Sequence, residues 1–482
     1  MTYSAAQIAK VGALAPPAAS PDATTRAHDA ARLLFRIENV PFSWWHTKAR
    51  IVMGSATFFD AFDALALAFV LPVLVGLWQL SPMQVGTLIA AGYLGQVIGA
   101  LSFGWLAERY GRVPSVTGAV ALMSVMSIVC ALTGNFTALF VTRFVQGIGV
   151  GGEVPIAAAY INELSQAKGR GRFFILYELI FPLGLMAAAQ VGSFVVPRFG
   201  WEYMFLVGGI PGMLILYFLA RLPESPRWLI SKGRFDKAAK LIEQIEASTP
   251  KRSLDPQQNA AAVTKRVDEL ADGILGQKKA SWRELFSPLY RPRTLVVWVL
   301  WASSYFVANG INNWLPTLYK TVFNMPLQES LRLASITNVL SVVAVLCCAL
   351  LVDRVGRRRW AIASFVICGA LLGVLAFLGA KSVWSVVILA SSAYAVMGTT
   401  TVLLYLYTPE IYPTRMRAIG TGLATSWLRV ASATAPAIVG LVIAKEGLAA
   451  VFIMFALANI VGLIAATRMI ETANRALEDI SP

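Results

Sequence analysis

The amino-acid sequence predicts an all-α membrane protein with twelve transmembrane helices in two pseudo-symmetric six-helix halves. Three observations carry this prediction: the composition, a series of long apolar runs, and a repeat that relates the two halves. Of the 482 residues, 57% are hydrophobic and only 14% are charged. Soluble domains average about 25% charged residues, so we expect a lipid bilayer to cover the apolar surface of this chain.

Twelve runs are long and apolar enough to cross a bilayer, which takes about 20 residues of helix. Lipid offers no hydrogen-bond partners, so spanning backbone must form helices or a closed barrel. The alternating pattern of barrel strands is missing from these runs, which therefore predict a helical bundle. The predicted spans are residues 51–77, 83–107, 114–134, 137–160, 173–196, 203–221, 294–318, 330–352, 360–379, 384–408, 419–442 and 448–469.

The loop charges set the expected orientation. Lys and Arg are concentrated in the loops on one side of this threading, whereas the other side carries scattered single charges. Cytoplasmic loops are enriched in Lys and Arg, so we expect both termini to be cytoplasmic. The net charge of +15 follows from these loops, and we do not expect nucleic acid as a partner.

The polar segments define further regions. Residues around 24–38 have apolar side chains at helical spacing with arginine opposite them, which is typical of a helix at a membrane surface. The sequence contains no GxxxxGK[ST] phosphate-binding loop, which argues against an ATP-driven pump, and we expect no cofactor and no metal site. The expected domains are residues 1–50 (cytoplasmic tail and interfacial helix), 51–222 (N-terminal half), 223–293 (cytoplasmic linker domain), 294–470 (C-terminal half) and 471–482 (cytoplasmic tail).

Short charged motifs repeat at a separation of about 245 residues, which indicates duplication and alternating access around a central site. An acid-Arg-x-Gly-Arg motif follows the second and eighth spans, and a Glu with an Arg seven residues later follows the fourth and tenth. We expect a gate in which carboxylates of one half pair with arginines or a helix end of the other; the alternative is that these charges only set the topology. The predicted gating residues are Glu108, Arg109, Arg112, Glu163, Arg170, Asp353, Arg354, Arg357, Glu410 and Arg417.

The combination of motifs resembles the major facilitator superfamily. The two acid-Arg-x-Gly-Arg copies, R-x-x-Q-G-x-G at residues 143–149 and P-E-S-P-R at residues 223–227 carry the resemblance. The last motif is similar to the sugar-porter-like branch, which also includes organic ion transporters. The resemblance implies the major facilitator fold and a secondary transporter, not an enzyme, and we expect a monomer.

Six ionisable residues lie inside the apolar runs, where each costs about 2.5–3.5 kcal/mol to insert. Two interpretations of Asp60, Asp63 and Arg143 are open. Desolvation favours a neutral carboxyl, so the group either exchanges protons during transport or forms a fixed buried pair that specifies the fold. Asp60 and Asp63 are three residues apart, which places them on the same side of the first span. The predicted proton-coupling residues are Asp60, Asp63, Arg143, Glu178 and Glu153, of which the last two have a structural role as an equal alternative.

Arg429, the sixth of these residues, lies in the middle of the eleventh run. Its planar guanidinium can bind a carboxylate through two hydrogen bonds, and the segment resembles that of organic-anion transporters. A permanent pair with Glu178 is the alternative. Aromatic rings would stack on a planar substrate and amides would bind its polar atoms, so the predicted substrate-binding residues are Arg429, Tyr305, Asn309, Asn313, Tyr177, Gln146 and Trp301.

The Asp-x-x-Asp element at residues 60–63 resembles bacterial aromatic-acid/proton symporters, and residues 37–63 look closest to the nicotinate transporters, which are related to synaptic vesicle glycoprotein 2. The resemblance implies proton-coupled uptake of a small aromatic carboxylate such as nicotinate across a bacterial-type inner membrane. The expected partners are this carboxylate, protons and the lipid bilayer. A sugar, polyol or other organic-ion porter is the alternative. A receptor or membrane enzyme fits poorly, because the only histidines, His28 and His46, lie outside the spans.

Overall fold

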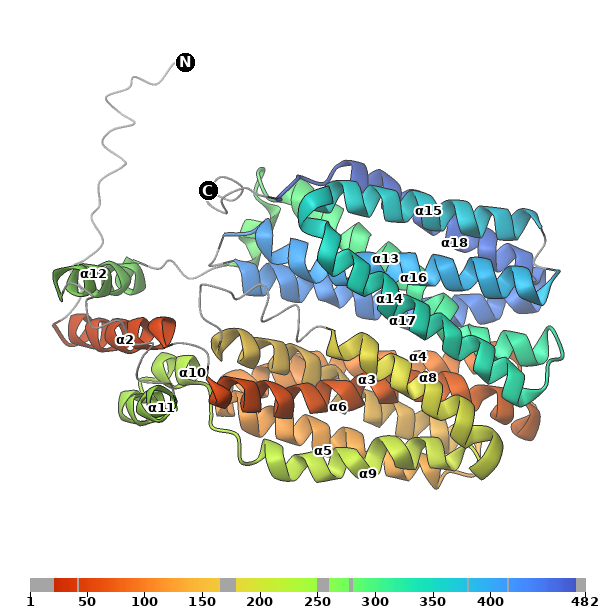
Figure 1. Ribbon diagram of the computed structural model, residues 1–482, viewed down its shortest axis with the longest axis horizontal. Helices are drawn as coiled ribbons and strands as arrows, with labels where there is room; N and C mark the ends of the chain where they lie inside the picture. The colour runs from red at the N-terminus through yellow and green to blue at the C-terminus, as the bar shows by residue number, and fades with distance from the viewer. Residues whose placement is uncertain are drawn as a thin grey trace, which may run out of the picture. The chain divides into compact units, whose positions relative to one another are not determined.

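The structure is a computed structural model that describes residues 21–40, 43–164, 179–248, 260–276, 281–378, 381–413 and 416–473. Within these ranges every regular element is a helix, as Figure 1 shows. Twelve helices of this described part are long and apolar enough to cross a membrane. The prediction of an all-α protein with twelve spans is therefore confirmed.

Six of these helices form each half. Several begin or end a few residues beyond the predicted apolar runs, because the polar ends of a spanning helix extend into the headgroup region. The first half contains α3 (Trp44–Trp78), α4 (Pro82–Tyr110), α5 (Arg112–Ala131), α6 (Phe136–Leu164), α8 (Ile180–Phe199) and α9 (Glu202–Leu219). The second contains α13 (Arg291–Thr321), α14 (Leu327–Val355), α15 (Arg357–Phe377), α16 (Val383–Glu410), α17 (Arg417–Glu446) and α18 (Leu448–Thr467).

The glycine of the repeated acid-Arg-x-Gly-Arg motif makes the turn between two spans. Gly111 joins α4 to α5 with φ of 123°, and Gly356 joins α14 to α15 with φ of 93°. Residues with a Cβ rarely adopt this region, whereas glycine does so readily. One residue can therefore reverse the chain between two long helices in each half.

Close packing of small residues joins the two halves. We call the end of the bundle where α3 begins and α18 ends the terminal face, and the other end the opposite face. Near the opposite face, Gly86 of α4 packs against the backbone of Pro436, and Gly440 of α17 packs against that of Pro82. Small residues let helix backbones approach closely in a bilayer. The two halves therefore meet tightly at the opposite face.

A second compact unit contains helices from the N-terminal region and from the linker between the halves. It comprises α2 (Pro21–Asn39), α10 (Pro226–Ser231), α11 (Phe235–Ala247) and α12 (Ala260–Gly276). Ala27 and Ala31 of α2 pack against Val267 and Ala271 of α12. The apolar side of the segment that the sequence places at a membrane surface is thus covered by a linker helix.

Candidate functional site

A cavity of about 150 Å³ lies between the two halves. Four helices of the first half (α3, α4, α6 and α8) and four of the second (α13, α14, α16 and α17) contribute to its wall. The wall combines apolar side chains with a polar set consisting of Thr57, Asp60, Tyr93, Gln96, Tyr305, Asn309, Asn312, Asn313, Ser341, Tyr394, Thr401, Tyr405, Arg429 and Ser432.

Arg429 of α17 lines this cavity and is only 8% exposed. Its Nη1 donates to the Thr425 carbonyl at 3.4 Å, and its Nη2 donates across the halves to the Gly151 carbonyl at 3.5 Å. Both distances are at the upper limit for hydrogen bonds. Within the described residues its Nε has no hydrogen-bond partner. The guanidinium therefore keeps donors for a ligand. Glu178, the alternative partner, lies outside the described residues.

An aromatic wall stands in the same cavity. Tyr305 of α13 and Tyr405 of α16 line it, and Trp301 lies behind them, fully buried. Trp301 stacks on Tyr305 with 5.5 Å between ring centroids, meets Tyr405 edge-on at 4.7 Å, and donates its indole N–H to Thr408. Trp301 is not part of the lining but holds the two tyrosines in place. Tyr177, the other predicted aromatic residue, lies outside the described residues.

Two asparagines of α13 connect this helix to other helices of the cavity wall. Asn309 Nδ2 donates to Ser432 Oγ on α17 at 2.6 Å. Asn313 Nδ2 donates to the Asn309 carbonyl at 2.9 Å and to Tyr93 Oη on α4 at 3.2 Å. Both asparagines line the cavity, as expected from their spacing along one helix face. The Asn313–Tyr93 bond also connects the two halves.

The intramembrane carboxyls of the first half separate into different surroundings. Asp60 lines the cavity, and its Oδ1 has no hydrogen-bond partner in the part of the chain that the structure describes. Asp63 points away from the lining and accepts a hydrogen bond from Ser127 Oγ at 2.9 Å. Glu153 is fully buried and accepts one from Thr57 Oγ1 at 2.8 Å. Of these three described carboxyls, Asp60 is thus the one that contacts the cavity.

Arg143 borders a second, much smaller space of about 10 Å³, which also involves Tyr93 and Asn313. Its Nη1 donates to the backbone carbonyl of Asp63 at 3.3 Å and to Gln146 Oε1 at 2.6 Å. Gln146 therefore holds Arg143 and is not in the cavity wall. The link between Arg143 and Asp63 runs through the Asp63 main chain.

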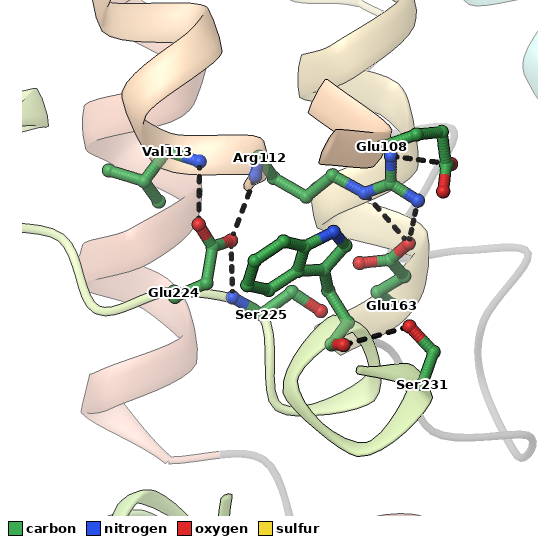
Figure 2. Close-up of polar contacts among 8 residues, drawn as sticks. Glu108, Arg112, Val113, Glu163, Glu224, Ser225 and Ser231 are labelled. Carbon is green, nitrogen blue, oxygen red and sulfur yellow. Dashed lines mark hydrogen bonds and ion pairs between the residues drawn. The ribbon is translucent and has the colours of Figure 1, made fainter. Parts of the chain in front are cut away.

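Three predicted gating residues of the first half cluster at the terminal face, namely Glu108, Arg112 and Glu163, as Figure 2 shows. Arg112 forms ion pairs with Glu108 at 2.7 Å and Glu163 at 3.0 Å. Glu224 caps the start of α5, where its carboxylate accepts the backbone N–H groups of Arg112 at 3.0 Å and Val113 at 3.3 Å. Burial raises the pKa of Glu224 despite these donors.

The second half repeats this arrangement. Arg357 pairs with Asp353 at 2.8 Å and Glu410 at 3.6 Å. Glu471 caps the start of α15 by accepting the backbone N–H groups of Arg357 at 2.8 Å and Arg358 at 3.2 Å. Burial alone would raise the pKa of Glu471, but the backbone N–H donors outweigh it and hold the pKa below its ordinary value.

Three further predicted gating residues in the described part of the chain lie outside these ion pairs. Arg109 extends over the Trp105 ring at 5.3 Å, and Arg417 donates to the Tyr412 carbonyl at 3.1 Å. Arg354 lines a shallow surface hollow, and Arg170 is outside the described residues. Each ion pair described here joins residues of one half. The predicted contacts between carboxylates of one half and arginines or a helix end of the other are not among these ion pairs, so the gating role stays a prediction.

Sequence reasoning did not single out Tyr93, Tyr405 or Glu471. A signal for Glu471 exists, because Glu471-Thr472 follows the last span as Glu224-Ser225 follows the sixth, at nearly the separation of the other repeats. The tyrosines carry no comparable signal. Tyrosine is common in membrane helices as an interfacial or packing residue, and its place in a cavity depends on how the helix is rotated.

A family model described as "Sugar (and other) transporter" matches residues 43–482. The chain is 34% identical over 459 residues to the niacin transporter NiaP of Acinetobacter baylyi, covering 93% of this chain and 99% of that protein. It is 29% identical over 403 residues to the 4-hydroxybenzoate transporter PcaK of the same organism, covering 83% and 84%. The xylose transporter XylE from E. coli, solved in a partially occluded inward open conformation, superposes with a TM-score of 0.68 at 20% identity, covering 90% of this chain and 100% of that chain.

The fold, the central cavity and these matches define a multi-pass integral membrane transporter of the major facilitator superfamily. The resemblance seen in the motifs is thereby confirmed. The chain belongs to the sugar (and other) transporter family.

Proposed function

We propose that the chain takes up a small aromatic carboxylate such as nicotinate, coupled to protons, by alternating access. The observation that carries this proposal is Arg429, buried in the cavity wall with its Nε unpartnered among the described residues. A buried cation needs an anion nearby, and a guanidinium matches a carboxylate in shape. Tyr305 and Tyr405 of the same wall offer aromatic contacts for a planar ring.

The size of the cavity supports a single-ring substrate. Its volume is about 150 Å³, whereas pockets for drug-sized ligands measure about 300–1,000 Å³. The niacin and 4-hydroxybenzoate transporters among its relatives are both named for small aromatic molecules. Size, charge and relatives therefore support the same substrate class.

Asp60 is the carboxyl that we place at the centre of proton coupling. It lines the same cavity as Arg429 but comes from the other half, and an unpaired anion is costly there. We infer that a substrate carboxylate on Arg429 competes with Asp60 for the positive charge, so that Asp60 takes up a proton when substrate binds. Asp63 and Glu153 are the neighbouring carboxyls that would share the proton, whereas Arg143 keeps its charge and would favour their ionised forms.

The terminal face is proposed to be cytoplasmic, because the loops at this end carry most of the Lys and Arg residues. The clusters around Arg112 and Arg357 would then be the parts of a cytoplasmic gate that closes by contacts across the halves. Such contacts must be modest in energy, since each transport cycle breaks them.

Uptake into proteoliposomes tests the proposal. Labelled nicotinate should accumulate with an inward proton gradient and not without one, and Arg429→Ala should lower uptake at least tenfold, the equivalent of about 1.4 kcal/mol. Arg429→Lys is the matched control, because it keeps the charge but loses the planar fork; it should retain part of the uptake. Asp60→Asn should retain exchange of substrate across the membrane but lose accumulation by the gradient.

Uptake that ignores the gradient would refute proton coupling, and full uptake by Arg429→Ala would refute the carboxylate site. The sugar or polyol alternative is favoured by one feature, the amides Gln96, Asn309 and Asn312 in the wall, since amides suit hydroxyl groups. Inhibition of nicotinate uptake by an excess of a pentose, or uptake of the pentose itself, would favour that alternative.

A further inference from the structure

Tyr93 is a polar residue of the cavity wall that the proposed carboxylate and proton sites do not use. It comes from α4 in the first half and borders both the cavity and the small space beside Arg143. Its Oη receives the hydrogen bond from Asn313 Nδ2 of the second half at 3.2 Å. Whether Tyr93 donates or accepts in this bond decides what it can offer to a substrate.

The orientation of the Asn313 amide settles the direction of the bond. The same Nδ2 lies 2.9 Å from the backbone carbonyl oxygen of Asn309. A carbonyl oxygen only accepts hydrogen bonds, so the atom facing it must be the amide nitrogen, and the flipped amide would bring two oxygens together. The nitrogen has two hydrogens: one goes to Asn309 and the other to Tyr93. Tyr93 Oη is therefore the acceptor.

As the acceptor, Tyr93 keeps its own hydroxyl hydrogen for another partner. No acceptor within the described ranges receives it at hydrogen-bond distance. A hydroxyl that lines a cavity and has no protein acceptor can donate its hydrogen to whatever fills the cavity. A substrate atom that accepts a hydrogen bond would fit this position.

The position of Tyr93 relative to Arg429 limits which substrate atom this can be. Arg429 Nη2 contacts the Gly151 carbonyl, and Gly151 packs directly against the backbone of Gln96 on α4. Tyr93 precedes Gln96 by three residues, or about 4.5 Å along the helix. Arg429 and Tyr93 also line the same cavity of about 150 Å³. We therefore expect the ring of a carboxylate held by Arg429 to extend toward this part of α4.

We propose that Tyr93 is a specificity-determining residue, which donates its hydroxyl hydrogen to the ring nitrogen of a pyridine carboxylate while Arg429 holds the carboxylate. The inference rests on the proposed function and names the substrate class more narrowly. A pyridine nitrogen is unprotonated and accepts hydrogen bonds at neutral pH. Benzoate has the same ring size and carboxylate but no acceptor in the ring, so it leaves the Tyr93 hydroxyl unpaired.

Competition for uptake measures this preference. In the wild-type transporter, benzoate should need about a tenfold higher concentration than nicotinate to halve the uptake of labelled nicotinate, which corresponds to one hydrogen bond. In Tyr93→Phe the ratio should fall to about one, because nicotinate loses affinity and benzoate does not. Uptake of labelled benzoate by Tyr93→Phe serves as the internal control for folding.

Asn313→Ala is the matched control variant. It removes the same bond between the halves but leaves the Tyr93 hydroxyl in place, so it should keep the preference for nicotinate even where total uptake falls. Loss of the preference in Asn313→Ala, with none in Tyr93→Phe, would assign it to the contact between the halves and overturn the proposal. Equal loss of nicotinate and benzoate uptake in Tyr93→Phe would overturn it as well.

A measurement on the unaltered protein keeps the inference testable if Tyr93→Phe does not fold. The wild type should discriminate among nicotinate, its two positional isomers and benzoate, with benzoate among the weakest competitors. Transport of nicotinate and benzoate with equal affinity would overturn the role of Tyr93 and leave the proposed function standing. Transport of neither carboxylate would overturn both.

Discussion

The two helix caps at the terminal face should respond differently to the same substitution. Glu224 and Glu471 each accept the first two backbone N–H groups of a span, those of α5 and α15. Burial raises the pKa of Glu224, whereas the N–H donors lower that of Glu471. The two carboxylates therefore make the same kind of cap, but the free-energy cost of keeping the charge is higher for Glu224 than for Glu471. We therefore expect Glu471→Gln to destabilise the protein more than Glu224→Gln.

The expected loss of stability depends on how many of the hydrogen bonds to the helix a glutamine side chain can still accept. At both sites one carboxylate oxygen makes the shorter bond to the helix, at 2.8 Å for Glu471 and 3.0 Å for Glu224. A glutamine carbonyl can replace that oxygen. Glu471→Gln then loses one weaker hydrogen bond and a charge at a helix N-terminus, together about 1–2 kcal/mol. Glu224→Gln loses a similar bond but removes a charge that burial disfavours, so the net change should be about 0.5 kcal/mol or less.

The pH dependence follows from the direction of each pKa change. The contribution of Glu471, with its lowered pKa, is complete above the ordinary carboxyl pKa of about 4.3 and is lost as pH falls through the lower folded value. Glu224, with its raised pKa, favours folding most below about 4.3, and this contribution is lost as pH rises through the raised value. The loss of unfolding free energy caused by Glu471→Gln should thus be largest at neutral pH and become smaller in acid.

Denaturant titration of the purified protein in detergent measures both variants at pH 7 and at the lowest pH where the wild type stays folded. An equal loss of unfolding free energy in Glu224→Gln and Glu471→Gln at pH 7 would refute the difference between the two caps. A loss of unfolding free energy in Glu471→Gln that is unchanged in acid would refute it as well.

Three further substitutions test the packing. Gly86→Ala places a Cβ against the backbone of α17, and overpacking of this kind costs about 1–3 kcal/mol. The substitution should open the cavity toward the opposite face, and thiol labelling of a cysteine introduced into the cavity measures this opening. Gly104→Ala is the control, because Gly104 has open space around it, and it should have no effect. Trp301→Phe removes the indole N–H bond and part of the stack behind the two tyrosines, so it should raise KM several-fold with the proton-to-substrate ratio unchanged. Arg36→Ala breaks a two-bond ion pair with α11, and faster proteolysis of the linker should accompany a loss of about 0.5–1 kcal/mol.

Most of the fold was predictable from the sequence, because a membrane protein must meet the requirements of the bilayer. A bilayer requires long apolar helices, so hydropathy located the twelve spans found among the described residues, most of their ends within about four residues; the largest differences are at the starts of α3 (Trp44) and α8 (Ile180). The tight turns at Gly111 and Gly356 were also predictable in principle, because only glycine readily adopts their backbone conformation. The packing of α2 on α12 was not, since an apolar helix face looks the same whether lipid or protein covers it.

The candidate site was harder to predict because helix rotation decides which residues face the cavity. Asp60 and Asp63 are three residues apart and so differ by about 60° around the helix axis. This difference is enough to place Asp60 in the cavity and Asp63 against Ser127. Trp301 and Tyr305 are neighbours on one face, yet Trp301 lies behind Tyr305. Sequence spacing gives neighbours along a helix but not their depth from a cavity.

The duplicated and unduplicated parts of the molecule have different tasks. Caps and ion pairs at the terminal face occur in both halves, around Arg112 and around Arg357. This symmetry suits two bodies that rock against each other, because each half then presents equivalent contacts to the other. The cavity is asymmetric, with Asp60 from the first half and Arg429 from the second. In the mechanism that we propose, a substrate anion that binds Arg429 changes the charge facing Asp60 across the boundary between the halves. The proposed coupling needs this difference between the halves, and a duplication preserved at the cavity would have removed it.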